Sequence, residues 1–243
     1  MESTTEAALN PEELAQMARA RASFYAFVNV HFTTLPDLGF VSHIRSSEYA
    51  SALQALVDDD TLPDDVTQGA ALMQGYIQSN LGLEPPAFSD NLGVDRTRLY
   101  RGVSPNYGPP PPYEAVWTKS GIGVTQLLQL VAQMYREAGM AVSADSKERL
   151  DYVGVELSFA QQLALREAEA WEAGDSERAK ALLQQQSGFL ANHVGQWAPF
   201  FIETALQRAD TDFYRGHLRL VRGLLASEQE RIQSLLEEVG PAA

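Results

Sequence analysis

The sequence predicts an all-α fold, a single-domain bundle of about seven or more helices. Apolar residues recur at spacings of three and four along most of the 243 residues, which is typical of amphipathic helices. The period-two alternation of half-buried strands is missing, and a composition that is 45% hydrophobic suffices for a sizeable core. No internal repeat divides the chain. We therefore expect one domain over residues 1–243, with a proline-rich hinge loop near residues 102–112.

The first half of the chain contains three segments with the start signals of helices. Each begins at a residue whose side chain can accept a hydrogen bond from a free N–H of the first turn. The expected starts are Asn10, which precedes Pro11 and two glutamates, then Ser46 or Ser47, and then Asp64 or Asp65. The first pattern continues for about 20 residues, the acidic run 58–60 closes the second, and Gly82 stops the third.

Helical patterns continue after the segment 92–100 and the proline hinge. Glycines mark two of their ends, where a left-handed cap or a turn is expected. The expected helices are 124–135, closed by Gly139; 147–173, the longest; a helix through Phe189 after the turn at Gly174; and a last helix begun by Asp210. These segments complete an all-helical pattern.

A rigid hinge carries the most informative residues. Four prolines, residues 109–112, favour a polyproline II segment, and Tyr113, Glu114 and Trp117 follow directly. Such a preorganised backbone suits a peptide, because aromatic rings cover apolar side chains and a carboxylate pairs with Arg or Lys. The alternative is a stiff loop whose aromatic residues fill the core, and spacing alone favours it.

We expect Tyr113, Glu114 and Trp117 to share one face with Asp151 and Glu156, which lie five positions apart on the longest predicted helix. On this hypothesis Glu114 and Asp151 speed the association of a basic peptide, because charge acts over about 8 Å at physiological salt. Trp117 slows dissociation, because aromatic burial acts only in contact.

Charge and composition exclude several classes of protein. With 32 acidic and 18 basic residues the formal net charge is −14, which should repel phosphate backbones and anionic membranes and attract a basic partner. The alternative is that the acidic excess only keeps the surface soluble. The absence of Cys excludes disulfides, thiolate nucleophiles and iron–sulfur ligation. The first ten residues lack the pattern of a signal peptide, and no apolar run reaches about 18 residues. We expect a cytoplasmic protein without stable membrane insertion and without a nucleic-acid partner.

The signatures of metal, nucleotide and acid–base chemistry are also missing. The four histidines, His31, His43, His193 and His217, form neither Glu-x-x-His pairs nor a His-Glu-x-x-His helix, so structural or surface roles are expected for them. The motif 121–123 lacks the third glycine and the preceding strand of a dinucleotide fingerprint. We therefore predict no catalytic residues, no metal, no cofactor and no enzymatic activity.

Ordered motifs around the hinge carry a family resemblance. The chain resembles the TorD-like chaperones, the redox-enzyme maturation proteins that serve complex molybdoenzymes. The motifs are Arg21 with Phe24-Tyr25 and Leu35-Pro36; Thr97-Arg98-Leu99-Tyr100-Arg101-Gly102; Pro112-Tyr113-Glu114-Ala115-Val116-Trp117; Leu150-Asp151-Tyr152 with Glu156-Leu157-Ser158-Phe159; and Phe189-Leu190-x-x-His193 with Trp197-x-Pro199-Phe200. They follow one another in order over nearly the whole chain.

The resemblance implies a cytoplasmic chaperone that catalyses nothing. It implies that the chaperone binds an apo-molybdoenzyme catalytic subunit, often through the twin-arginine signal peptide of that subunit. The chaperone keeps the subunit competent for molybdenum cofactor insertion before export. The expected client-binding residues are Tyr113, Glu114, Trp117, Asp151, Tyr152 and Glu156. The chain departs from the family in two motifs. Leu150-Asp151-Tyr152 stands where Pro-Asp-His is usual, and Tyr113-Glu114-Ala115-x-Trp117 stands where Tyr-Glu-Ser-x-Tyr is usual.

Two further hypotheses come from other classes of protein. A helical enzyme or cofactor-binding protein would use a cavity inside the bundle. A Pro-rich adaptor would present residues 109–112 to an SH3-like partner. Neither the particular client nor the oligomeric state, monomer or swapped dimer, follows from the sequence.

Overall fold

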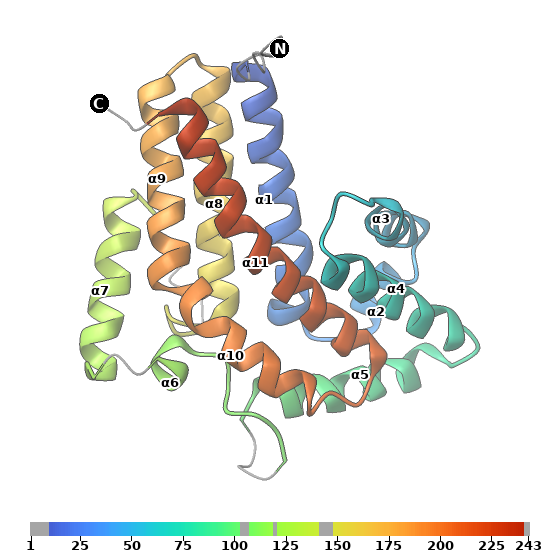
Figure 1. Cartoon of the computed structure of the whole chain (residues 1–243). Coiled ribbons are helices and arrows are strands. Elements are labelled where there is room, and N and C mark those ends of the chain that lie inside the picture. The colour runs from blue at the N-terminus through green and yellow to red at the C-terminus, as the bar shows by residue number, and fades with distance from the viewer. Residues whose placement is uncertain (1–9, 103–106, 119–120, 141–147, 241–243) are drawn as a thin grey trace.

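The computed structural model describes residues 10–102, 107–118, 121–140 and 148–240, and there it confirms the all-α prediction (Figure 1). Parts of three expectations lie outside the described residues: the N-terminal segment 1–9, residues 103–106 of the hinge, and residue 147. The helices are α1 (Pro11–Thr33), α2 (Leu38–Ile44), α3 (Ser47–Asp58), α4 (Asp64–Ser79), α5 (Pro85–Tyr100), α6 (Glu114–Trp117), α7 (Val124–Glu137), α8 (Val153–Glu172), α9 (Ser176–Asn192), α10 (Val194–Leu206) and α11 (Asp212–Val239).

Helix α11 contacts both α4 and the bundle that contains α1 and α9. Figure 1 shows α1, α8 and α9 side by side, with α11 crossing obliquely from α4 to this bundle. The crossing on α4 requires glycine on both helices. A Cβ added to Gly69 would lie 2.6 Å from the carbonyl oxygen of Gly216, and one added to Gly216 would clash with the Gly69 carbonyl. The two backbones therefore touch, and no larger side chain fits between them.

Five of the described helices, α1, α2, α3, α9 and α11, begin at a residue whose side chain caps the first turn. Asn10 accepts a hydrogen bond from the Glu13 N–H at 3.0 Å, and the Glu13 carboxylate accepts from the Asn10 N–H at 2.9 Å, which completes a capping box. Ser46 caps α3 as predicted. Helix α11 is different, because Thr211 and not Asp210 is its N-cap. The Asp210 carboxylate instead pairs with Arg98 at 2.5 Å.

Three further predicted boundaries are wrong. Helix α4 begins after Pro63 without a side-chain cap and ends at Ser79, before Gly82. The longest predicted helix begins at Val153 and not near residue 147, so Asp151 precedes the helix on which we expected it. The reason is tertiary: the Asp151 carbonyl accepts from the Glu114 N–H at 2.9 Å, and this pairing holds residues 148–152 against the hinge. Short helices α2 and α6 were not predicted.

Two sets of polar residues lie inside the core. His31 and His217 are buried with ring centroids 4.8 Å apart, and tyrosine hydroxyls approach a nitrogen of each ring. Burial lowers the pKa of His31 to about 4. In the other set, Arg21 pairs with Glu167 and Glu228, and burial raises the pKa of Glu228 to about 7 although Arg21 acts in the opposite direction.

Candidate functional site

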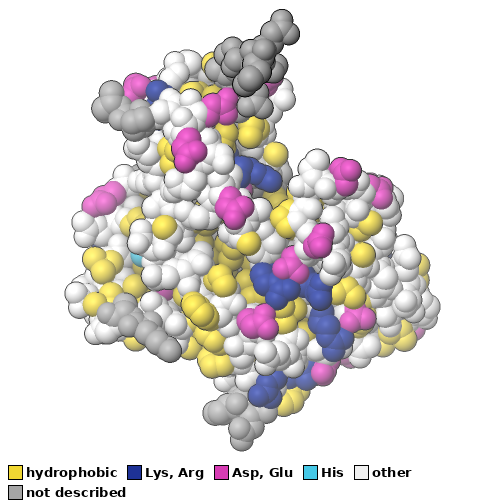
Figure 2. Space-filling model, in the orientation of Figure 1, with side chains coloured by type: hydrophobic (Ala, Val, Ile, Leu, Met, Phe, Trp, Pro, Cys, Tyr) yellow, Lys and Arg dark blue, Asp and Glu magenta, His cyan; other side chains and the backbone are white. Residues whose placement is uncertain are grey.

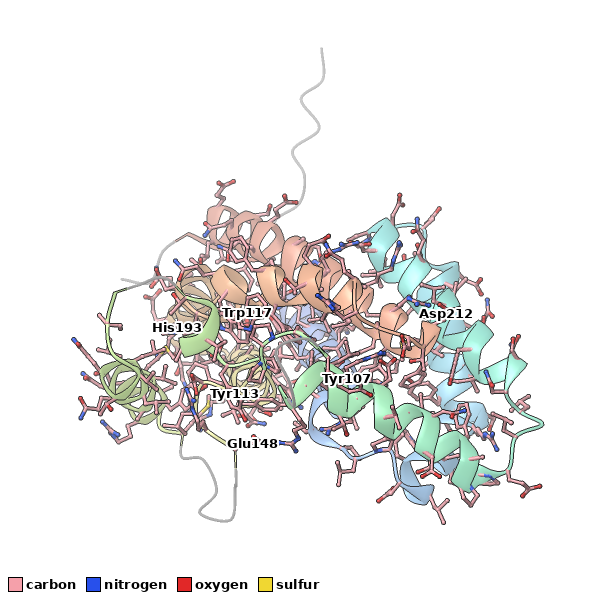
Figure 3. The ribbon with its side chains drawn as sticks, turned by 90° about the horizontal axis from the view of Figure 1, so that it is seen from below. Tyr107, Tyr113, Trp117, Glu148, His193 and Asp212 are labelled. Atoms are coloured by element: carbon pink, nitrogen blue, oxygen red, sulfur yellow. The ribbon has the colours of Figure 1, made fainter. Side chains whose placement is uncertain are left out.

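The hinge, the turn before α8, and the start of α10 meet at one end of the bundle. Figure 3 shows Tyr113, Trp117 and His193 gathered there, with Glu148 beside Tyr113. The Tyr113 hydroxyl donates to Glu148 Oε2 at 3.0 Å, and the Arg149 guanidinium lies 4.7 Å from the Tyr113 ring centroid. Tyr113 also contacts the Tyr152 ring at 5.4 Å. Residues from the hinge and from the turn before α8 are therefore joined directly.

Asp151 is the central acceptor of this junction and is buried. Its Oδ2 accepts from the Ala115 N–H at 3.1 Å, a group that the short helix α6 cannot satisfy internally. The Arg149 guanidinium donates to both oxygens, at 3.0 and 2.6 Å. Tyr152, also buried, donates from its hydroxyl to the Phe32 carbonyl at 2.9 Å. Asp151 and Tyr152 thus anchor α6 and α1 to the start of α8.

Glu114 and Glu156 form a buried carboxyl pair. Both side chains are buried, and His193 Nδ1 lies 3.1 and 3.2 Å from the two oxygens of Glu114. The Trp197 indole donates to Glu156 Oε2 at 3.0 Å. Burial, followed by the neighbouring Glu114 carboxylate, raises the pKa of Glu156 well above its ordinary value, while the Trp197 hydrogen bond opposes the shift. We call Glu114, Asp151 and Glu156 the carboxylate cluster.

An open groove lies next to the carboxylate cluster. Its volume is about 690 Å³, and its lining residues are Trp117, Thr118, Gln196, Trp197, Phe200, Glu203 and Thr204. Trp117 is half-buried, donates its indole N–H to the Pro111 carbonyl at 3.0 Å, and packs against Phe201 with ring centroids 5.7 Å apart. Phe200 is 65% exposed, and hydrophobic side chains gather over α6 and α10 in Figure 2.

The structure brings all six predicted residues to one end of the bundle, but it divides them by exposure. Trp117 lines the groove and Tyr113 is half-buried, whereas Glu114, Asp151, Tyr152 and Glu156 are buried in the free protein. Contact of these six residues with a client stays a prediction. Trp117 also packs against the core, which is one of the two roles that the sequence left open for it.

Sequence reasoning missed several residues of this region as site residues. Phe200 could have been found from the pattern of α10, because Trp197, Phe201 and Ala205 form its buried stripe and Phe200 falls outside it. No local pattern indicates that His193 contacts Glu114, which lies 79 positions earlier.

The hinge geometry bears on the adaptor hypothesis. Pro109 and Pro112 are buried, Pro111 is half-buried and Pro110 is exposed, and the Pro112 carbonyl accepts a hydrogen bond from the Val153 N–H at 3.0 Å. A partner that binds a polyproline II helix needs its prolines on the surface.

Within the part of the chain that the structure describes, no helix is long and apolar enough to cross a membrane.

The motifs, now placed on an all-helical fold around one end of the bundle, define the class as that of the TorD-like chaperones. The model of the family described as nitrate reductase delta subunit matches residues 59–203, and the chain belongs to this family. A chaperone protein TorD of Vibrio cholerae is 23% identical over 230 residues, which cover 93% of this chain and 98% of that protein. A chaperone protein TorD of Photobacterium profundum is 28% identical over 111 residues, 45% of this chain and 50% of that protein. These comparisons confirm the family that the motifs predicted.

Proposed function

We propose that the protein is a cytoplasmic chaperone specific for one molybdoenzyme. It binds the apo form of the catalytic subunit through the twin-arginine signal peptide and keeps it competent for molybdenum cofactor insertion before export. It catalyses no reaction itself. Family membership and the chaperone relatives support this proposal.

The groove beside Trp117 is the observation that carries the proposal. Its volume of about 690 Å³ lies in the usual range of ligand sites, roughly 300–1,000 Å³. Phe200 leaves most of its ring in water, and an exposed aromatic residue on the wall of a groove is typical of an interaction surface. The apolar part of a signal peptide would cover Phe200 and the exposed side of Trp117.

The exposure of the acidic residues indicates which of them would attract a basic segment of the client. The carboxylate cluster is buried, so its charges are poorly placed to meet a client at the surface of the free protein. Glu203 stands on the groove wall with a side chain that is 60% exposed, and it pairs with Arg222 at 3.0 Å. We propose that Glu203, together with the net charge of −14, attracts the arginines of the signal peptide.

Binding kinetics with the signal peptide of the client subunit test this proposal. We expect Phe200→Ala to speed dissociation about tenfold, because one lost aromatic contact in a binding site costs about 1.4 kcal/mol or more. Leu38→Ala is the matched control, since Leu38 is 56% exposed but lies on α2, away from the groove. Glu203→Gln should chiefly slow association and reduce its salt dependence. Equal dissociation rates for Phe200→Ala and Leu38→Ala would rule out this groove.

A further inference from the structure

The single acidic side chain on the groove wall is contacted by a cation of the same protein. Among the described residues that line the groove, Glu203 is the only one that carries a charge. Its Oε2 accepts a hydrogen bond from Arg222 Nη1 at 3.0 Å. Arg222 lies on α11 and is not one of the lining residues. The free protein therefore presents a partly neutralised carboxylate to a basic segment that enters the groove.

Arg222 is held from its other side by Asp65 of α4. Its Nε and Nη2 donate to the two Asp65 oxygens at 2.6 and 2.8 Å, which is the bidentate geometry that a guanidinium and a carboxylate favour. The hydrogen bond from Arg222 lowers the pKa of Asp65, although partial burial of the carboxyl opposes the shift. Arg219 adds a second cation 3.8 Å from Asp65. Helices α4, α11 and α10 are thus joined by one line of charges that ends at the groove.

The packing of α11 on α4 limits the positions that Arg222 can take. A Cβ added to Gly223 would lie 2.7 Å from Val66 Cγ2 and 3.2 Å from Asp65 Cβ, so the backbone next to Arg222 touches α4. Figure 2 shows Lys and Arg side chains gathered over this part of α11, with acidic side chains beside them. Within the described residues Arg222 is the one partner of the Glu203 carboxylate, and it uses Oε2. Oε1 therefore stays available to an incoming cation.

We propose that Arg222 determines how strongly the groove attracts a basic segment, because it offsets the charge of Glu203 in the free protein. Asp65 limits this effect, since it shares Arg222 with Glu203. The inference rests on the proposed function and assigns a role to two residues outside the groove. Removal of the Arg222 charge should strengthen the attraction, and removal of the Asp65 charge should weaken it.

Association kinetics with a pair of short synthetic peptides test this inference. The first peptide has two adjacent arginines before an apolar stretch, and the second has glutamines in place of both arginines. We expect Arg222→Gln to speed association of the arginine peptide about threefold at low salt, the factor that corresponds to one unit charge about 6 Å away in water. The salt dependence of the association rate should become steeper. Asp65→Asn should slow association of the same peptide.

Three variants separate a local effect from a general change in charge. Arg215→Gln is the matched control, because Arg215 is also a partly exposed residue of α11 but pairs with Asp212, away from the groove. It should change the association rate less than Arg222→Gln does. Arg222→Lys should leave the rate near that of the unsubstituted protein, because the charge is kept. In a Glu203→Gln chain, Arg222→Gln should act no more strongly than Arg215→Gln, because the carboxylate that Arg222 offsets is gone.

The outcomes also separate this inference from the proposed function. A gain with the arginine peptide that disappears in the Glu203→Gln chain supports the role of Arg222. If this peptide binds but Arg222→Gln and Arg215→Gln change its association equally, the role is overturned and the proposed function stands. An equal gain with the glutamine peptide overturns the role too, because no charge is then involved. If the arginine peptide does not bind the unsubstituted protein, the proposed function fails and this inference fails with it.

Discussion

The carboxylate cluster and the groove lie side by side, yet they differ in the residue types that dominate them and in the exposure of these residues. The cluster consists of charged residue types and is buried, whereas the groove is lined by two tryptophans and by Phe200, which is mostly exposed. The usual distribution would bury the aromatic rings and expose the carboxylates. The comparison teaches that the acidic residues of the motifs hold the fold together at this end, and that Phe200 and one side of Trp117 are the aromatic surface that reaches solvent.

Unpaired backbone groups explain why the acids are inside. A four-residue helix such as α6 leaves its first N–H groups without internal partners, and Asp151 supplies acceptors for two of them through its carbonyl and its carboxylate. Glu156 accepts from the Trp197 indole, a donor that would otherwise be buried without a partner. The buried carboxylates are thus matched to donors that the fold itself creates.

The largest effect that would sharpen this comparison is expected from Asp151→Ala. The substitution leaves the Ala115 N–H and the Arg149 guanidinium without their acceptor, so we expect a loss of about 3 kcal/mol in the free energy of unfolding, measured in urea. Asp151→Asn should lose less, because its amide oxygen still accepts one bond. If Asp151→Ala unfolds like the unsubstituted protein, the structural role of the cluster is refuted.

The next effect concerns the pH dependence of stability. The pKa of Glu156 is higher in the folded protein than its ordinary value of 4.5, so the folded state holds a proton that the unfolded state releases. Stability from this group is full below pH 4.5 and is lost as the pH rises through the folded pKa.

Glu156→Gln should remove this loss, because an amide does not titrate. The measurement is the unfolding free energy of Glu156→Gln minus that of the unsubstituted protein, taken at each pH from 5 to 8. In this difference the contributions of Glu228 and of the buried histidines cancel, since both proteins contain them. A constant difference over that range would mean that Glu156 releases its proton in the folded protein as easily as in the unfolded chain.

A smaller effect is expected from Trp117→Phe, which tests a groove residue that also packs against the core. Loss of the indole bond to the Pro111 carbonyl should cost about 1 kcal/mol of stability, because the ring remains but its donor is removed. The client should dissociate only slightly faster, since an aromatic face is kept. Thermal unfolding and peptide kinetics on the same sample separate these outcomes. A fold that fails to form would show that Trp117 serves chiefly as a core residue.

The smallest effect on stability is expected from Phe200→Ala. An exposed side chain contributes little to folding, so the unfolding free energy should change by less than about 0.5 kcal/mol. The same variant is expected to show the large change in client dissociation. A loss of more than about 2 kcal/mol would instead place Phe200 among the core residues, as happens for large-to-small changes in buried positions.

The sequence by itself determined most of the longer helices and the family. Apolar periodicity and cap residues are local signals, so the capping box at Asn10, the cap at Ser46 and the left-handed Gly139 followed from neighbouring residues alone. The ordered motifs indicated the TorD-like family and the six residues that meet at one end of the bundle. Errors arose where a distant contact overrode a local signal, as at the start of α8, where the turn is held by the hinge.

Only the tertiary structure decided which of these residues face solvent. Glu114 meets His193 across 79 positions, and Glu156 meets Trp197 across 41, and no periodic pattern encodes such pairs. An isolated Glu or Asp is expected at the surface, because its desolvation is costly unless a partner compensates it. The partners come from other helices, so burial of the acids and exposure of Phe200 depend on how the helices pack against one another.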